Sequence, residues 1–135
     1  MRVALGTDER SALSDALAGA LRAKGHVVIA VADPLPWPEA GRAVGDAVAE
    51  GRADRGVVCC WTGTGVSIAA NKVPGIRAAL CTDAVTAEGA RRWNDANVLA
   101  LSVRLVTPAV GAEILDAFLT VEADDGESDT IARLP

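Results

Sequence analysis

The sequence is poor in aromatic residues, with one phenylalanine, three tryptophans and no tyrosine among 135 residues. It also lacks a basic segment, because its 13 lysines and arginines are scattered along the chain and the formal net charge is −5. Proteins that bind nucleic acids use basic surfaces against the phosphates and aromatic rings against the bases. The composition therefore argues against nucleic acid as a partner.

Long apolar runs, a signal peptide and metal-binding spacings are missing as well. No apolar stretch reaches the roughly 18–20 residues that a membrane span needs, and Met1 and Arg2 lead directly into a strand-like segment. Of the three cysteines, Cys59 and Cys60 are neighbours that cannot easily form a disulfide, and no C-x-x-C pair is present. We therefore expect a cytoplasmic protein with reduced thiols, no membrane contact, no metal and no cofactor.

Half of the residues are apolar, and strand-like runs alternate with helical spacing. A chain of this length suits a single domain spanning residues 1–135. The pattern predicts strands at 2–8, 26–31, 56–61, 76–82 and 97–103. It predicts helices at 11–25, 41–51, 67–72, 86–96 and 108–121. Residues 33–40 contain too many prolines for regular structure, and the polar tail, residues 121–135, is expected to be extended.

Strands that alternate with helices indicate repeated βαβ units and a parallel sheet. All-apolar strands such as VVIAV fit a sheet that is covered on both faces. The expected fold class is α/β, a Rossmann-like three-layer αβα sandwich around five parallel strands. In such sheets ligands bind beyond the carboxyl ends of the strands. That edge of the sheet carries the segments 7–9, 60–63, 82–83 and 102–104.

The segment GVVCCWTGTGVSIAANK, residues 56–72, places a thiol at the end of a strand and before a glycine-rich loop. Successive side chains of a strand point to opposite faces, so Cys59 and Cys60 differ in environment, and Cys60 is the one nearer the open edge. The free amides between Thr62 and Ser67, with the positive end of the following helix, favour a thiolate and an oxyanion nearby. Cys60 is thus a candidate base or nucleophile. Alternatively, both cysteines are small core residues.

Other interpretations of polar residues remain open at this point. The G-T-G-V-S-I run lacks the third glycine of a dinucleotide motif, and no Walker lysine is correctly spaced. Asp8 could bind substrate hydroxyls or cap a helix. Asn94 could donate to an oxyanion or simply form a turn, and Arg104 could meet an anion or lie in solvent. His26 lies at a strand start, and we interpret it as structural.

Together these segments resemble the family of type B ribose-5-phosphate isomerases and galactose-6-phosphate isomerase subunits. The most specific part is CWTGTGVSIAANKVPGIRAALC, residues 60–81, supported by GTD after the first strand and NDANVL before the last. The resemblance covers nearly the whole chain. It implies an aldose–ketose isomerase that moves a proton between adjacent carbons through an enediolate.

The resemblance also implies roles for individual residues. Cys60 matches the family's base, and Thr62 matches a threonine associated with opening of the sugar ring. Asp8 and Asn94 match substrate-binding positions, and Arg104 matches a phosphate-binding arginine. Gly63, Gly65 and Ser67 match the loop whose amides hold the enediolate. Relatives build this site between two subunits, which implies a homodimer, or a tetramer of such dimers, with a shared active site.

Several positions depart from the family pattern. Glu9 and Trp93 stand where the family has histidines, and Glu127 stands where it has a tail arginine. Tryptophan cannot transfer a proton at neutral pH, and acidic replacements weaken binding of a phosphate dianion. Trp61 replaces a glycine, and with Trp93 it provides a platform for a sugar or a contact with a neighbouring subunit. Trp37 replaces a tyrosine.

These departures favour a variant substrate. We expect an isomerase acting on a small sugar or sugar phosphate that is open-chain, short or weakly anionic, because an open chain needs no ring-opening acid. Glu9, Trp61 and Trp93 are expected to contact this substrate. The alternative is a non-catalytic or repurposed carbohydrate-binding protein that has inherited the cysteine.

Overall fold

The computed structural model describes residues 1–135 and contains a five-stranded, fully parallel sheet with the strand order β2-β1-β3-β5-β4. The strands are β1 (Arg2–Thr7), β2 (Val27–Ala32), β3 (Arg55–Cys60), β4 (Ala78–Leu80) and β5 (Val98–Ser102). The helices are α1 (Ala12–Ala23), α2 (Trp37–Ala49), α3 (Thr64–Asn71), α4 (Ala84–Asn94), α5 (Pro108–Thr120), the 3-10 turn η1 (Asp125–Glu127) and α6 (Ser128–Ile131).

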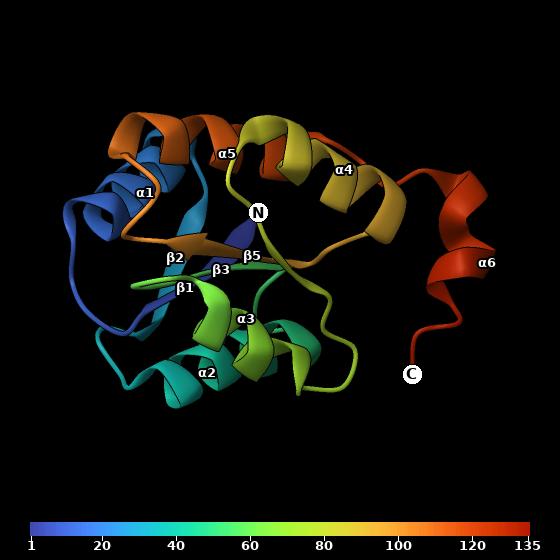
Figure 1. Ribbon diagram of the computed structural model, residues 1–135, viewed down its shortest axis with the longest axis horizontal. Coiled ribbons are helices and arrows are strands. Elements are labelled where there is room, and N and C mark those ends of the chain that lie inside the picture. The colour runs from blue at the N-terminus through green and yellow to red at the C-terminus, as the bar shows by residue number, and fades with distance from the viewer.

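The helices cover both faces of the sheet. Figure 1 shows α1, α4 and α5 on one face and α2 and α3 on the other, with α6 set apart from both layers. The expected three-layer αβα sandwich is therefore confirmed. Each face has its own apolar core, one centred on Leu17, Leu99 and Phe118 and the other on Val44, Val58 and Val66.

Local sequence signals explain most helix starts. Ser11 caps α1 and forms a reciprocal capping box with Ser14, as the position of Ser11 predicts. Thr107 caps α5, and Pro108 occupies its first turn, where a missing N–H costs nothing. Along α1 the buried residues Leu13, Leu17 and Leu21 recur at helical spacing and face the sheet.

Three predicted boundaries are wrong. Residues 33–40 are not wholly irregular, since α2 begins at Trp37, with Pro38 in its first turn, where proline is tolerated. The third helix begins at Thr64 instead of Ser67, because Gly63 adopts a positive φ of 75° that turns the chain directly into the helix. The fourth strand is limited to three residues.

The tail is not extended. It forms η1 and the one-turn helix α6. Two local hydrogen bonds stabilise these turns: Asp124 Oδ1 accepts from the Gly126 N–H at 2.9 Å, and Ser128 Oγ donates to the Asp125 carbonyl at 2.9 Å. Short polar residues form such side-chain turns readily. The overall hydrophobic pattern of the tail contains no information about them.

The strand order creates a switch point between β1 and β3. From β1 the chain crosses over to β2 on one side, and the later strands β3, β5 and β4 all lie on the other side. The connections therefore diverge at the carboxyl ends of β1 and β3. This divergence leaves the crevice in which ligands of such sheets bind.

Candidate active site

Cys60 is the last residue of β3, at the switch point. Its side chain lies on the face covered by α2 and α3, in the same apolar cluster as Val66 of α3, and the residue keeps 5% of its surface exposed. Cys60 is thus almost fully buried among apolar side chains, and it directly precedes the loop that leads into α3. The structure places Cys60 where a strand-end base is expected.

Cys59 has a different environment, as strand alternation predicts. It lies in the opposite cluster, under α1 and α5, and is fully buried. Burial is the main cause that raises the pKa of the Cys59 thiol to about 12, and nearby Cys60 and Asp8 raise it further. Cys59 therefore remains a neutral thiol with a packing role.

The amino end of α3 presents free backbone donors beside Cys60. No side chain caps this helix, and its first backbone hydrogen bond runs from the Ser67 N–H to the Gly63 carbonyl at 3.2 Å. The N–H groups of Thr64, Gly65 and Val66 consequently have no partner within the helix. The sequence predicted free amides between Thr62 and Ser67. The Ser67 amide is not free, because it donates the first hydrogen bond of the helix.

Gly63 and Gly65 are required by close packing. A Cβ on Gly63 would lie 2.5 Å from Leu80 Cδ1 and 2.9 Å from the carbonyl carbon of Leu101, and the residue has a positive φ. A Cβ on Gly65 would lie 2.8 Å from the ring of Trp37. The glycines thus let α3 approach the ends of β4 and β5, and they leave room for the indole of Trp37 against Gly65.

Hydrogen bonds hold the loop between Cys60 and α3. Ser102 Oγ donates to the Trp61 carbonyl at 2.9 Å, and the Arg104 N–H donates to the same carbonyl at 2.9 Å. The hydroxyls of Thr62 and Thr64 lie 2.7 Å apart and share a hydrogen bond. The sequence placed Ser102 at this edge without a role and did not single out Thr64. Both side chains form these bonds only because the loop folds onto β5.

Asp8 brings a carboxylate to the same edge. Its N–H donates to the Cys59 carbonyl at 3.2 Å, so the residue lies beside the end of β3. Its Oδ1 atom is buried and has no hydrogen-bond partner. An unpaired buried oxygen of this kind is costly and is common where a ligand supplies the missing donor. Glu9 follows on the exposed side, with its carbonyl accepting from Thr7 Oγ1 at 2.5 Å.

Arg104 also lies at this edge, exposed and without an ion pair, whereas nearby Arg10 is bound to Asp33 at 2.7 Å. An arginine with a free guanidinium is available for an anionic ligand. The edge in one chain therefore collects the predicted residues Asp8, Glu9, Cys60, Trp61, Thr62, Gly63, Gly65, Ser67 and Arg104.

Asn94 does not join them in the same chain. Trp93 and Asn94 end α4, which starts beyond the carboxyl end of β4 and runs back for 11 residues, about 16 Å. The Asn94 carbonyl accepts from Arg77 Nε at 3.1 Å, and Arg77 precedes β4. Asn94 thus lies at the amino edge of the sheet, and Trp93 lines a hollow along β4 that includes Leu80. Sequence spacing could not show this, because helix direction depends on topology.

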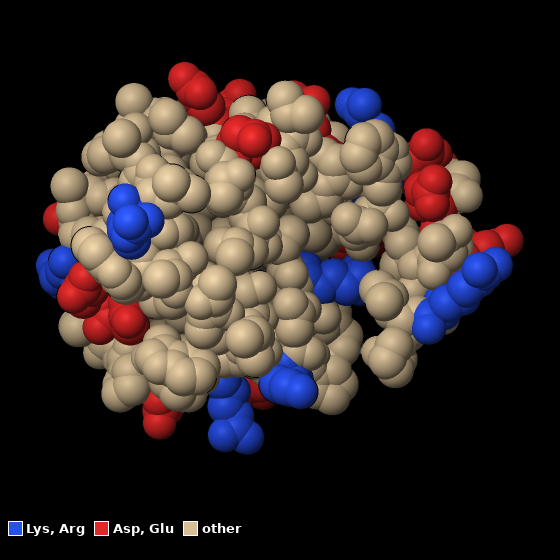
Figure 2. Space-filling view, in the orientation of Figure 1, with Lys and Arg blue, Asp and Glu red and all other residues tan.

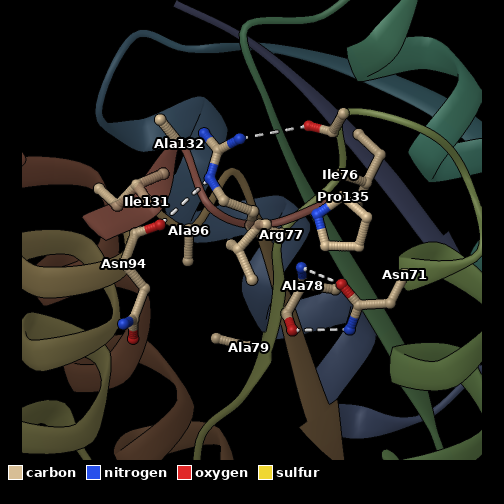
Figure 3. Close-up of a pocket in the computed structure, with 12 residues that line it drawn as sticks. Asn71, Ile76, Arg77, Ala78, Ala79, Asn94, Ala96, Ile131, Ala132 and Pro135 are labelled. Carbon is tan, nitrogen blue, oxygen red and sulfur yellow. Dashed lines mark hydrogen bonds between the residues drawn. The ribbon is translucent and has the colours of Figure 1, made fainter. Parts of the chain in front are cut away.

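A hollow lies at that opposite edge. It has a volume of about 660 Å³ and is formed between the body and the C-terminal tail. Figure 2 shows this hollow with basic atoms on its inner wall, and Arg77 is the one basic residue among its lining residues. Figure 3 shows Arg77 at its centre and Ile131, Ala132 and Pro135 of the tail around it, while the amide of Asn71 pairs with both backbone groups of Ala78 at 2.8 and 2.9 Å.

The structure contains no group of three or more histidine, cysteine or carboxylate side chains that could hold a metal ion. No helix has the length and apolar character needed to cross a bilayer. The polar groups that the carboxyl edge offers are a thiol, hydroxyls, a carboxylate and backbone amides.

Comparison with known proteins gives matches to one family, several of them over nearly the whole chain. The Ribose/Galactose Isomerase family model matches residues 3–133. The D-erythrulose-4-phosphate isomerase of Pectobacterium atrosepticum is 36% identical over 134 residues, which cover 95% of this chain and 88% of that protein. Ribose-5-phosphate isomerase B of Escherichia coli is 42% identical over 90 residues, which cover 67% of this chain and 60% of that enzyme. The solved structure of ribose-5-phosphate isomerase B from Clostridium thermocellum matches with a TM-score of 0.93 at 38% identity, covering 99% of this chain and 95% of that one.

Proposed function

The chain belongs to the ribose/galactose isomerase family of aldose–ketose isomerases, and from this premise we propose that it isomerises an open-chain sugar phosphate with Cys60 as the base. The observation that carries this proposal is the placement of the Cys60 thiol directly before three unpartnered amides of α3. A base and a set of oxyanion donors are the two elements that enediolate chemistry requires.

The reaction can be written with these residues. The Cys60 thiolate removes the proton from the hydroxyl-bearing carbon next to the carbonyl. The electrons of that C–H bond form a carbon–carbon double bond, and the carbonyl oxygen becomes the enediolate oxyanion. The N–H groups of Thr64, Gly65 and Val66, at the positive end of α3, stabilise this charge. The thiol then returns the proton to the neighbouring carbon.

Two further groups bind the substrate in this proposal. The unpaired Oδ1 of Asp8 accepts a hydrogen bond from a sugar hydroxyl, which supplies the donor that the folded chain lacks. The free guanidinium of Arg104 meets the phosphate, and the exposed rings of Trp37 and Trp61 flank the sugar.

The open-chain character of the substrate follows from the missing histidine. Trp93 cannot act as an acid that opens a sugar ring. A four-carbon sugar phosphorylated on its terminal oxygen has no hydroxyl left to close a five-membered ring, so it needs no such acid. The Pectobacterium relative is named for a substrate of this type, D-erythrulose 4-phosphate. We therefore propose a four-carbon sugar phosphate as the first substrate to test.

A shared site between two chains explains the position of Asn94. It lies at the opposite edge from Cys60 of its own chain, so it can reach a Cys60 only in a second subunit. The exposure of Trp61 and Trp93, each at 56%, supports burial at such an interface, because tryptophan is strongly buried on average. We propose a homodimer in which each chain contributes Asn94 to its partner's site.

Proton exchange in heavy water tests the proposed function. The protein is incubated with erythrulose 4-phosphate, ribose 5-phosphate and unphosphorylated tetroses, and deuterium uptake next to the carbonyl is followed by NMR. We expect exchange with the four-carbon phosphate, and its loss by at least about a hundredfold in Cys60→Ala. Cys59→Ala is the matched control and should retain exchange. Binding of a sugar without any exchange would instead identify a carbohydrate-binding protein.

A further inference from the structure

The two threonines at the start of α3 form a hydroxyl pair. Thr62 Oγ1 and Thr64 Oγ1 lie 2.7 Å apart, and both residues are exposed. The left-handed conformation of Gly63, with a φ of 75°, reverses the chain between them and brings the two side chains together. Either hydroxyl can be the donor of this hydrogen bond.

The hydrogen bond to Thr64 limits the directions in which the Thr62 hydroxyl proton can point. A single threonine hydroxyl rotates among staggered positions, and its proton can point in several directions. When Thr64 donates to Thr62 Oγ1, the proton of Thr62 is directed elsewhere and is free for a substrate oxygen. The exposed Thr64 hydroxyl is at the same time in contact with solvent. The pair can therefore connect a substrate oxygen to water.

Isomerisation needs such a connection because it moves a proton on oxygen as well as one on carbon. Cys60 accounts only for the carbon proton. The single histidine of the chain, His26, contacts the amino group of Met1 at 3.1 Å, beside the start of β2 and away from this edge. The chain contains no tyrosine. Besides the carboxyl groups of Asp8 and Glu9, the carboxyl edge of the chain offers hydroxyls that can pass a proton, and Thr62 and Thr64 are the pair that directly follows Cys60.

We propose that Thr64 is a positioning residue that orients Thr62 as the proton donor to the enediolate, an inference that rests on the proposed function of the site. The enediolate oxygen takes the Thr62 proton, Thr62 takes the Thr64 proton, and Thr64 takes one from a water molecule. The hydroxide formed is neutralised by the proton that leaves the second substrate oxygen, whose electrons form the new carbonyl. Cys60 regains its thiolate when its proton returns to carbon.

The test compares exchange with isomerisation in Thr64→Val, which removes the hydroxyl at nearly constant shape. We expect kcat for isomerisation to fall about tenfold, the size of one hydrogen bond, with KM changed less than about twofold. Deuterium uptake by the unreacted substrate should fall much less, because Cys60 still removes the carbon proton. The ratio of exchange to isomerisation therefore rises. Thr64→Ser should restore both rates.

Two controls separate this role from a structural one. Thr120→Val removes a similar helix-end hydroxyl, which donates to the Asp116 carbonyl at 2.8 Å, and should leave both rates unchanged. The double variant Thr62→Val/Thr64→Val should be no slower than Thr62→Val alone, because the two hydroxyls act as one unit.

The outcomes are distinguishable. An unchanged ratio of exchange to isomerisation in Thr64→Val, or strictly multiplicative effects of the two valine substitutions, would overturn the positioning role. Persistent exchange in Cys60→Ala would instead overturn the proposed function on which this role depends.

Discussion

Cys59 and Cys60 are adjacent in β3, but their side chains lie on opposite faces of the sheet and differ in environment. Cys59 is fully buried between the sheet and α1, and its pKa is raised to about 12, whereas Cys60 lies on the other face and borders the open edge. Strand alternation alone separates the two side chains. A single-residue slip of β3 would exchange their positions, so the register of β3 with β1 and β5 fixes which sulfur can act as the base.

Asp8 provides a test at the residue scale. Its buried Oδ1 has no hydrogen-bond partner, so the folded protein bears a desolvation cost that a substrate hydroxyl would relieve. Asp8→Asn replaces the charge by a neutral amide. We expect the free energy of unfolding to rise by about 1 kcal/mol, while kcat/KM falls.

Urea denaturation and steady-state kinetics measure these two changes. Glu113→Gln is the control, because Glu113 is exposed in the middle of α5 and makes no ion pair, and it should change neither quantity appreciably. If Asp8→Asn lowers stability instead, the unpaired oxygen is not a cost in the folded protein, and its assignment to a substrate hydroxyl loses its support.

At the scale of the element, the position of α3 depends on how closely its first turn approaches the sheet. Gly63 turns the chain with a positive φ and lies against Leu80 and Leu101, and Gly65 lies against Trp37. These contacts fix the first turn of α3, whose three free amides follow Cys60 closely in the chain. A side chain added at Gly63 or Gly65 would therefore shift the first turn of α3.

Gly63→Ala tests this packing. The new Cβ would need a strained backbone and would lie 2.5 Å from Leu80 Cδ1. We expect a loss of at least ~2 kcal/mol in the free energy of unfolding, together with a fall in kcat as the amides move. Gly51→Ala is the matched control, since Gly51 also has a positive φ of 73° but has no atoms within 4 Å of the added Cβ.

The control should lose only about 1 kcal/mol and keep full activity. Equal losses in the two variants would mean that backbone conformation alone accounts for Gly63, and that the close approach of α3 to the strand ends has no energetic consequence.

At the scale of the whole molecule, the two halves of the proposed site lie at opposite edges of the sheet. Cys60 follows the carboxyl end of β3, whereas Asn94 lies by Arg77 at the amino end of β4. A homodimer solves this problem by symmetry, because a two-fold axis can place the amino edge of one chain against the carboxyl edge of the other.

Subunit complementation tests this arrangement. Cys60→Ala and Asn94→Ala should each be inactive alone. After the two variants are mixed, unfolded and refolded together, half of the dimers are mixed and contain one intact site, so about a quarter of the wild-type activity should return. Sedimentation analysis should show dimers in all three samples.

The control is a mixture of Cys60→Ala with Thr62→Val. Both changes affect the same chain's half of the site, yet each mixed dimer then has one site that lacks Cys60 and one that lacks Thr62, so no intact site forms. Recovery in this mixture, or its absence in the first, would contradict a site shared between subunits.

Much of the fold could be predicted because its signals are local. The alternation of apolar runs and helical spacing indicates the five strands and the parallel sandwich, and Ser11 and Pro108 mark helix starts by their own hydrogen-bonding chemistry. The start of α3 at Thr64 and the turns of the tail escaped prediction. They depend on the backbone angle of Gly63 and on specific side-chain bonds, which the hydrophobic pattern does not record.

The sequence by itself determined the fold class, the family and the identity of the candidate base, because strand periodicity and a long motif are properties of neighbouring residues. Only the tertiary structure decided that Asn94 lies at the far edge from Cys60 of the same chain, and that Thr64 pairs with Thr62. These relations depend on strand order, helix direction and one turn at Gly63. They join residues whose distance in space bears no fixed relation to their distance along the chain.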